Sequence, residues 1–205
     1  MKVRQGYVHE VTLNDVDVTR QTMDMRYLVI VRHAKASPPL PMGLDFDRPL
    51  SGRGRKQCKQ LRAWARDAES LGRFGPVTAL VSSAVRTSET FELGFEGTDF
   101  VADRTFERSI YAGTREVTGE DLLQALRDID PMTTSLMIVG HNPSVHDLMF
   151  VLAREVPEEL RTQSFALGGA YVLALPDGEM LQAQRYEVVA SYIPDQKERK
   201  IAASP

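Results

Sequence analysis

The 205-residue sequence holds only four histidines, His9, His33, His141 and His146, and a single cysteine, Cys58. One cysteine excludes an intramolecular disulfide and a metal site built from cysteines. The sequence also lacks an excess of positive charge, because 25 Lys and Arg against 28 Asp and Glu leave a formal net charge of −3. Binding of nucleic acid through a generally basic surface is therefore not expected. The scarce histidines become the first candidates for chemistry.

Long apolar runs are absent as well. The most apolar stretches, Tyr27–Val31 and Leu136–Gly140, have the length of one strand each, whereas a membrane-spanning helix needs about 20 residues. Residues 1–14 lack the apolar run of a secretory signal peptide. We therefore expect a cytoplasmic protein without a membrane partner.

The chain divides into an extension and one domain. Residues 1–24 form an N-terminal extension, in which the partial alternation of Tyr7–Leu13 is compatible with an edge strand and equally with an arm. Residues 25–205 show no internal repeat and no linker, so we expect a single domain there. The sequence leaves the oligomeric state open.

Apolar runs and helical periodicity together predict the fold class. Strands are expected at Tyr27–Val31, Val77–Val81, Leu136–Val139, Tyr171–Leu175 and Tyr186–Tyr192, with a short one near Phe100–Val101. Helices are expected from Ser51-Gly52 to about Ala68, after an N-terminal cap at Ser82-Ser83, over Glu120–Ile129, and from Ser144. This order predicts a single-domain α/β fold with a mostly parallel sheet flanked by helices, and the last two strands predict a C-terminal β-hairpin.

Three of the predicted strands end in polar clusters. Arg32-His33 follows the first strand, Ser82-Ser83 with Arg86 follows the second, and His141-Asn142 follows the third long apolar strand. Ligands of open α/β sheets bind beside the carboxyl ends of the strands, so we expect these clusters to face one crevice. Arginine suits phosphate or carboxylate, and a neutral histidine is a competent nucleophile near pH 7. The sequence thus favours an anionic substrate, with phosphate as the natural choice.

Four segments, in this order, resemble the histidine phosphatase superfamily, which includes phosphoglycerate mutases, and most of all its SixA-type phosphohistidine phosphatases. They are Val31–Ser37 with the Arg-His pair, Asp47–Gln57, Ser82–Thr90 and Val139–Pro143. The resemblance extends from about Tyr27 to Ile193 and implies a phosphoglycerate-mutase-like fold.

The resemblance also implies roles for single residues. His33 would be the nucleophile that carries the phosphoryl group transiently, while Arg32, Arg86 and His141 would bind its oxygens. Glu107 is the first candidate for the general acid, and Asp103 is the second. No metal and no other cofactor is expected, because the two arginines and His141 supply the positive charge.

The implied activity is that of a metal-independent phosphatase, acting on a phosphorylated protein or a small phosphate compound. The segment around Glu107 lacks a clear mutase-like motif, and a leaving imidazole needs an acid less than an alcohol does. This favours protein phosphohistidine as the substrate. Small phosphoesters remain an alternative, and so does a catalytically idle module that binds phosphoproteins.

The other candidate residues have plainer interpretations. We expect Cys58 in the core, on the apolar stripe of its helix, and His146 in a structural or solvated position. Lys35, Arg53 and Arg55 are near the expected phosphate site and are interpreted mainly as surface residues.

Overall fold

The computed structural model describes residues 25–194 except 40, 112–115, 131, 133 and 184–185. The predictions made for residues 1–24, including His9, lie outside the described residues. Within the described ranges, no helix has both the length and the apolar character needed to cross a membrane.

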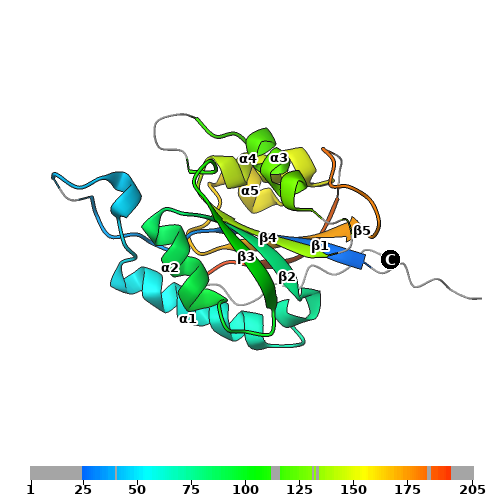
Figure 1. The fold of residues 1–205 in the computed structure, drawn as a ribbon, viewed down its shortest axis with the longest axis horizontal. Coiled ribbons are helices and arrows are strands. Elements are labelled where there is room, and N and C mark those ends of the chain that lie inside the picture. Colours follow the sequence, from blue (N-terminus) through cyan, green and yellow to red (C-terminus); the bar gives the residue numbers. More distant parts are fainter. Residues whose placement is uncertain are drawn as a thin grey trace, which may run out of the picture.

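A mixed sheet of six strands forms the centre of the described structure (Figure 1). The strands are β1 (Met25–Arg32), β2 (Val77–Ser82), β3 (Val101–Glu107), β4 (Ser135–Gly140), β5 (Ala170–Pro176) and β6 (Glu187–Tyr192). Their order is β3-β2-β4-β1-β5-β6. The four strands from β3 to β1 are mutually parallel, whereas β5 pairs antiparallel with both β1 and β6. The predicted α/β fold, mostly parallel with a C-terminal hairpin, is confirmed.

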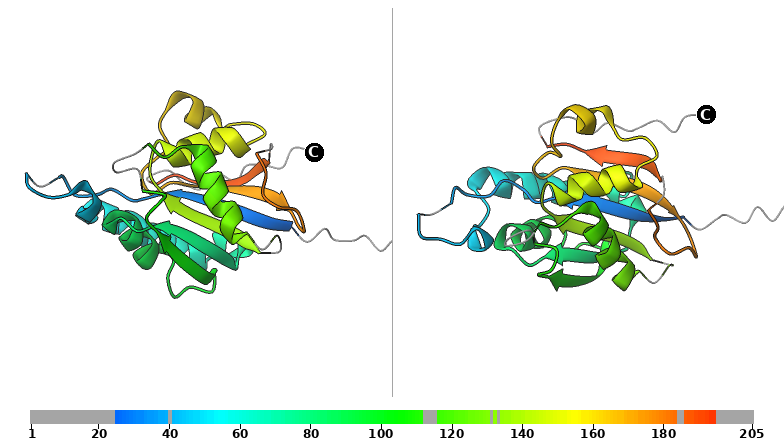
Figure 2. Two further views of the ribbon diagram at one scale, coloured as in Figure 1. Left: turned by 45° about the horizontal axis from the view of Figure 1, so that its top comes forward. Right: turned by 90° about the horizontal axis from the view of Figure 1, so that it is seen from above.

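Helices cover both faces of the sheet (Figures 1 and 2). The helices are α1 (Gly52–Arg66), α2 (Val85–Gly94), α3 (Gly119–Ile129), α4 (Ser144–Leu152) and α5 (Glu158–Thr162), with 3₁₀ turns η1 (Asp45–Asp47) and η2 (Leu71–Phe74). One face carries α1 and α2, and the other carries α3, α4 and α5. This arrangement buries the sheet between two helical layers, as the apolar strands require.

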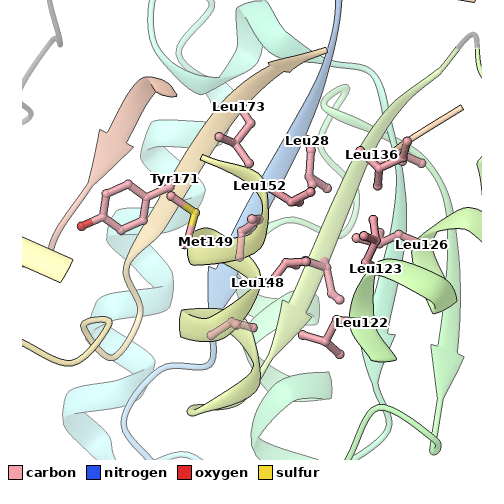
Figure 3. Packing of buried hydrophobic residues seen from close by; sticks show 14 of the residues in the cluster. Leu28, Leu122, Leu123, Leu126, Leu136, Leu148, Met149, Leu152, Tyr171 and Leu173 are labelled. Atoms are coloured by element: carbon pink, nitrogen blue, oxygen red, sulfur yellow. The ribbon is translucent and has the colours of Figure 1, made fainter. Parts of the chain in front are cut away.

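The side chains of β1 alternate between the two faces of the sheet and contribute to two hydrophobic cores. Leu28 and Ile30 pack with the leucines of α3 and α4, whereas Val29 and Val31 pack against α1 and α2. All four side chains are fully buried. Figure 3 shows the first of these cores, in which the side chains of α3 and α4 meet the sheet. Successive side chains of a strand point to opposite faces, so a continuous apolar run is needed wherever both faces are covered.

The local structure differs from the prediction in four places. Ser82-Ser83 does not cap α2, because Ser82 belongs to β2 and the N-cap is Ala84, without a side-chain hydrogen bond. The short strand expected near Phe100 extends from Val101 to Glu107. Helix α5 was not predicted, and α1 ends at Arg66 rather than near Ala68. The cap prediction failed because tertiary contacts at the end of β2 recruit the Ser82 hydroxyl, as described below.

The carboxyl ends of β1, β2 and β4 lie together at one edge of the sheet, since these strands are parallel neighbours. The segment from β1 to α1, which includes η1, projects from this edge (Figures 1 and 2). The three polar clusters singled out in the sequence are therefore brought to the same place, as expected.

Candidate active site

His33 follows β1 directly and is held by the neighbouring backbone. Its backbone N–H donates to the Gly140 carbonyl at 3.0 Å, and its ring Nδ1 lies 2.7 Å from the Ala34 carbonyl oxygen. A carbonyl oxygen only accepts, so Nδ1 carries the ring proton of the neutral side chain. The lone pair is then on Nε2, the atom available for nucleophilic attack.

The surroundings of His33 favour its neutral form. The side chain is only 8% exposed. Burial lowers its pKa to about 4, the hydrogen bond to Ala34 acts in the opposite direction, and the positive charges of Arg86, Arg32 and Arg48 lower it further. A buried imidazole among cations is uncharged at neutral pH, as a nucleophile must be.

His141 lies across from His33, with ring centroids 5.1 Å apart. Its Nε2 is 2.8 Å from the hydroxyl oxygen of Ser82, while its Nδ1 is buried without a partner in the described structure. Burial lowers the pKa of His141 to about 2, with further lowering from the proximity of His33 and from the charge of Arg86. If Ser82 donates to Nε2, the proton of the neutral ring is on Nδ1, which can then donate to a ligand.

The two arginines approach the histidines from different elements. Arg86, in the first turn of α2, is 7% exposed and donates through both terminal nitrogens to Asp45. Arg32, the last residue of β1, donates to the Phe165 carbonyl, and burial lowers its pKa. Both charges act on His33 and His141, so the four residues predicted from the sequence form one cluster.

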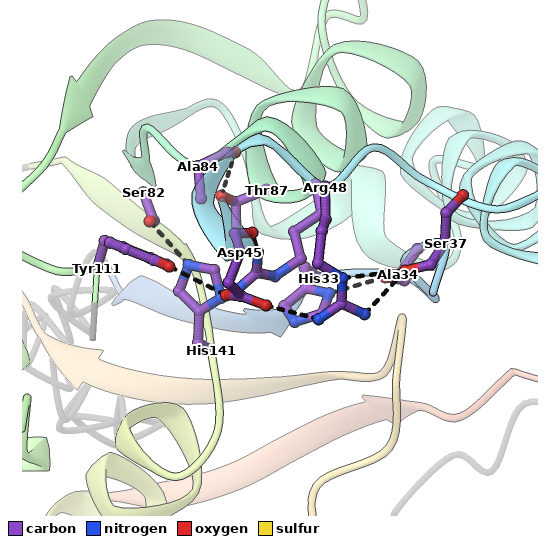
Figure 4. Close-up of polar contacts among 11 residues, drawn as sticks. His33, Ala34, Ser37, Asp45, Arg48, Ser82, Ala84, Thr87, Tyr111 and His141 are labelled. Atoms are coloured by element: carbon purple, nitrogen blue, oxygen red, sulfur yellow. Dashed lines mark hydrogen bonds and ion pairs between the residues drawn. The ribbon is translucent and has the colours of Figure 1, made fainter. Parts of the chain in front are cut away.

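Asp45, Arg48 and Tyr111 complete this cluster (Figure 4). The Asp45 carboxylate accepts from Arg48 at 2.6 Å, from Arg86 at 2.9 Å and from the Tyr111 hydroxyl at 3.0 Å. Burial opposes ionisation of Asp45, but hydrogen bonds from Arg48 and Tyr111 and the charge of Arg86 lower its pKa to about 2. These residues were not predicted as site members, because no periodicity in the sequence fixes where their loops fold.

Several buried polar atoms at this edge have no hydrogen-bond partner in the described structure. They belong to the side chains of Arg32 (Nε), Ser83 (Oγ), His141 (Nδ1), Asn142 (Oδ1) and Ser144 (Oγ). All five residues lie at or just beyond the carboxyl ends of β1, β2 and β4. Buried polar groups are rarely left unpaired, and a concentration of them is typical of a site for a polar ligand.

The two candidates for the general acid lie on β3. Glu107 ends the strand at the site edge, but its carboxylate accepts from the backbone N–H of Ser109 at 2.7 Å. Hydrogen bonds from Ser109 lower the pKa of Glu107, so it is ionised at neutral pH. Asp103 is paired in register with Thr78, near the opposite ends of the strands. The role of Glu107 stays a prediction, and Asp103 lies away from the histidines.

The remaining candidates occupy ordinary positions. Cys58 is fully buried, and burial raises its pKa to about 11, as expected of a core thiol. His146 lies 2.9 Å from the Leu160 carbonyl through Nε2, which ties α4 to α5. Arg55 pairs with Glu89 at 2.8 Å, whereas Lys35 and Arg53 line a shallow hollow with Gln57 and Leu167.

Among the described residues, no group of three or more His, Cys, Asp or Glu side chains is arranged to hold a metal ion. The site is cationic: three arginines surround two neutral histidines and one carboxylate. Such an arrangement can bind a phosphoryl group and offer it a nitrogen nucleophile.

No family model matches the sequence, and no curated protein matches it either. Solved structures do match. A protein provisionally named phosphohistidine phosphatase SixA from Agrobacterium tumefaciens superposes with a TM-score of 0.64 at 24% identity, over 82% of this chain and 99% of that one. Its provisionally named counterpart from Nakamurella multipartitia gives a TM-score of 0.66 at 22% identity, over 84% and 98%.

A third match is the protein histidine phosphatase SixA complexed with tungstate, with a TM-score of 0.61 at 16% identity, over 82% of this chain and 97% of that one. The chain thus has the fold of these SixA proteins over most of its length. The resemblance found in the sequence is confirmed at the level of the fold.

Proposed function

We propose that this protein is a phosphatase that works through a phosphohistidine intermediate on His33. One observation carries the proposal: a buried, neutral histidine presents Nε2 beside Arg32, Arg86 and a second neutral histidine. The likeness in fold to SixA proteins supports it, because the match extends over 82–84% of this chain. The proposal applies to a phosphorylated protein or a small phosphate compound.

In the proposed first step, His33 Nε2 attacks phosphorus, forming a P–N bond while the bond to the leaving group breaks. Arg32, Arg86 and the Nδ1–H of His141 donate to the oxygens of the phosphoryl group and offset the charge that develops on them. In the second step, water attacks phosphorus and the P–N bond breaks. Inorganic phosphate leaves, and His33 is again neutral.

We infer protein phosphohistidine as the preferred substrate. An ionised Glu107, with its pKa lowered by Ser109, is a poor proton donor at neutral pH. An imidazole leaving group whose distal nitrogen is already protonated departs without help, whereas an alkoxide does not. The site therefore suits a P–N bond better than a sugar phosphate ester. Small phosphoesters remain the second candidate.

The proposal is tested by trapping the intermediate. Brief incubation of the protein with a ³²P-labelled phosphohistidine peptide, in EDTA, should give an acid-labile, alkali-stable label on the protein and release phosphate. His33→Ala should lose both label and turnover. His146→Ala is the matched control, because His146 lies on α4 and contacts the Leu160 carbonyl rather than the site.

The substrate class is tested by comparing three phosphorylated substrates. Phosphohistidine peptide, phosphoserine peptide and a sugar phosphate are compared by kcat/KM with the same preparation, and phosphohistidine should be hydrolysed fastest. Faster hydrolysis of the sugar phosphate would assign the protein to small phosphoesters. Tight binding of a phosphopeptide without any turnover would instead identify a binding module. Dependence of turnover on an added divalent metal would contradict the metal-independent mechanism.

A further inference from the structure

The cationic site already contains an anion of the protein's own. Asp45 on η1 accepts from both terminal nitrogens of Arg86, at its backbone carbonyl (2.6 Å) and at its carboxylate (2.9 Å). The same carboxylate accepts from Arg48 and from the Tyr111 hydroxyl. Figure 4 shows Asp45 among His33, His141 and Tyr111. Both terminal nitrogens of Arg86 therefore already donate to Asp45.

We propose that Asp45 is a specificity-determining residue that competes with the incoming anion for Arg86. This rests on the proposed function in one respect, namely that Arg86 binds the phosphoryl group. A bidentate contact of Arg86 with a phosphoryl group uses the nitrogens that now donate to Asp45. Asp45 and an end-on phosphoryl group therefore compete for this pair of nitrogens.

The contact between Asp45 and Arg86 can be broken with little loss of buried surface. The Asp45 side chain is 50% exposed, whereas that of Arg86 is 8% exposed. Element η1 has only three residues, none of them buried, and follows the fully exposed Met42. Moving η1 outward therefore uncovers little apolar surface. Besides Asp45, Phe46 attaches η1 through an edge contact with the Tyr111 ring and through the guanidinium of Arg108, which lies over the Phe46 ring.

Arg48 caps η1 through its backbone N–H, but its side chain also has a partner other than Asp45. Its Nε and second terminal nitrogen donate to the Ser37 carbonyl at 3.0 and 2.8 Å. Its charge already acts on His33. When Asp45 leaves, Arg48 and Arg86 are both free to donate to the ligand. A phosphoryl dianion interacts more strongly with two guanidiniums than a monoanionic carboxylate does, so Asp45 selects for doubly charged anions.

Binding of inorganic phosphate, measured by calorimetry, tests this without any need for turnover. Asp45→Asn should bind phosphate five- to tenfold more tightly than the wild type, because the competing anion is gone. Asp47→Asn is the matched control, since it makes the same charge change on the same 3₁₀ turn at an exposed position. Its affinity should equal that of the wild type. In Asp45→Ala, formate should compete with phosphate, which it should not do in the wild type.

Equal affinities of Asp45→Asn and Asp47→Asn would overturn the proposal. So would weaker phosphate binding by Asp45→Asn, which would make Asp45 a partner of the bound ligand. If Asp45→Asn fails to fold, Tyr111→Phe removes one hydrogen bond from the carboxylate, and its affinity should rise two- to threefold. Absence of turnover in every form together with tighter phosphate binding would refute the proposed function and support the role of Asp45.

Discussion

At the scale of single residues, burial sets the protonation of the site. His33 and His141 are almost inaccessible to solvent and lie among arginines, so both rings are uncharged at neutral pH. The backbone selects the tautomer of His33 through Ala34, and Ser82 faces Nε2 of His141. Two identical side chains thus present different nitrogens, which suits the proposed roles of His33 as nucleophile and His141 as donor.

The pH dependence of kcat/KM should reflect the lowered pKa of His33. Protonation removes the lone pair of Nε2, so kcat/KM falls only as pH drops through the pKa of about 4. The profile should therefore stay level through pH 6.5, where an unperturbed histidine would already be half protonated. Steady-state rates between pH 4 and 8 with a substrate of constant ionisation would measure it. An acid limb centred near 6.5 would contradict this picture.

Ser82→Ala should act through His141. Without the hydroxyl, nothing directs the proton of His141 to Nδ1, and the ring loses one hydrogen bond. We expect kcat/KM to fall about tenfold, on the scale of one lost hydrogen bond of roughly 1–1.5 kcal/mol. ¹⁵N NMR of the histidine rings distinguishes this from a general loss of structure, because the tautomer of His141 should change and that of His33 should not. An unchanged His141 tautomer would exclude a positioning role.

At the scale of elements, α1 fixes the segment that follows His33. Ser51 caps the helix, accepting from the Gly54 N–H at 3.1 Å, while its own N–H and hydroxyl donate to the Lys35 carbonyl at 2.9 Å. The Gln57 side chain accepts from the Lys35 N–H and donates to the Leu167 carbonyl. The first turns of α1 therefore hold the chain two residues after His33.

Gly54→Ala tests this contact. A Cβ at residue 54 would lie 2.2 Å from the Lys35 carbonyl oxygen, so the backbone after His33 must shift. We expect a loss of roughly 1–3 kcal/mol in the free energy of unfolding, as for overpacked sites, and a lower kcat/KM. Gly52→Ala is the control on the same helix, where nothing lies within 4 Å of the added Cβ. Urea denaturation measures the free energy of unfolding of both variants. Equal values would show that α1 shifts to accommodate the added Cβ without disturbing the site.

At the scale of the whole molecule, the parallel pairing of β1, β4 and β2 brings the residues of the candidate site together. The register of β1 and β4 brings Arg32 opposite Gly140, directly before His33 and His141. The site then carries a thermodynamic cost at low pH, because the folded state keeps both histidines neutral. Unfolding restores ordinary pKa values to them.

Stability should therefore fall on acidification. The pKa values of His33 and His141 in the folded state lie below the ordinary histidine value of 6.5. At pH 5.5 the unfolded chain therefore binds more protons than the folded protein, and the free energy of unfolding falls. Two such groups together cost about 2–3 kcal/mol between pH 7.5 and 5.5. Urea unfolding at both pH values measures this. In His141→Asn, the decrease in the free energy of unfolding between these pH values should be about half that of the wild type. A wild-type free energy of unfolding that does not change over this range would contradict the burial of neutral histidines.

The sequence by itself determined the fold class, and it predicted four site residues that the fold brings together. Apolar runs such as Tyr27–Val31 and Leu136–Val139 identify strands covered on both faces, and polar clusters at strand ends identify the edge where ligands bind. Both signals are local, so they can be interpreted without knowing what lies nearby in space. The extent of β3 and the cap of α2 were mispredicted because their hydrogen bonds are made with distant residues.

Only the tertiary structure decided the electrostatics of the site. The contact of Asp45 with Arg86 joins residues from η1 and α2, and that of Ser82 with His141 joins the ends of two strands. Neither pair follows from periodicity or composition. Protonation depends on burial and on charges within a few ångströms, which exist only once the chain has folded. For that reason the sequence could propose His33 as a nucleophile, but the structure was needed to show that it is neutral and which nitrogen is free.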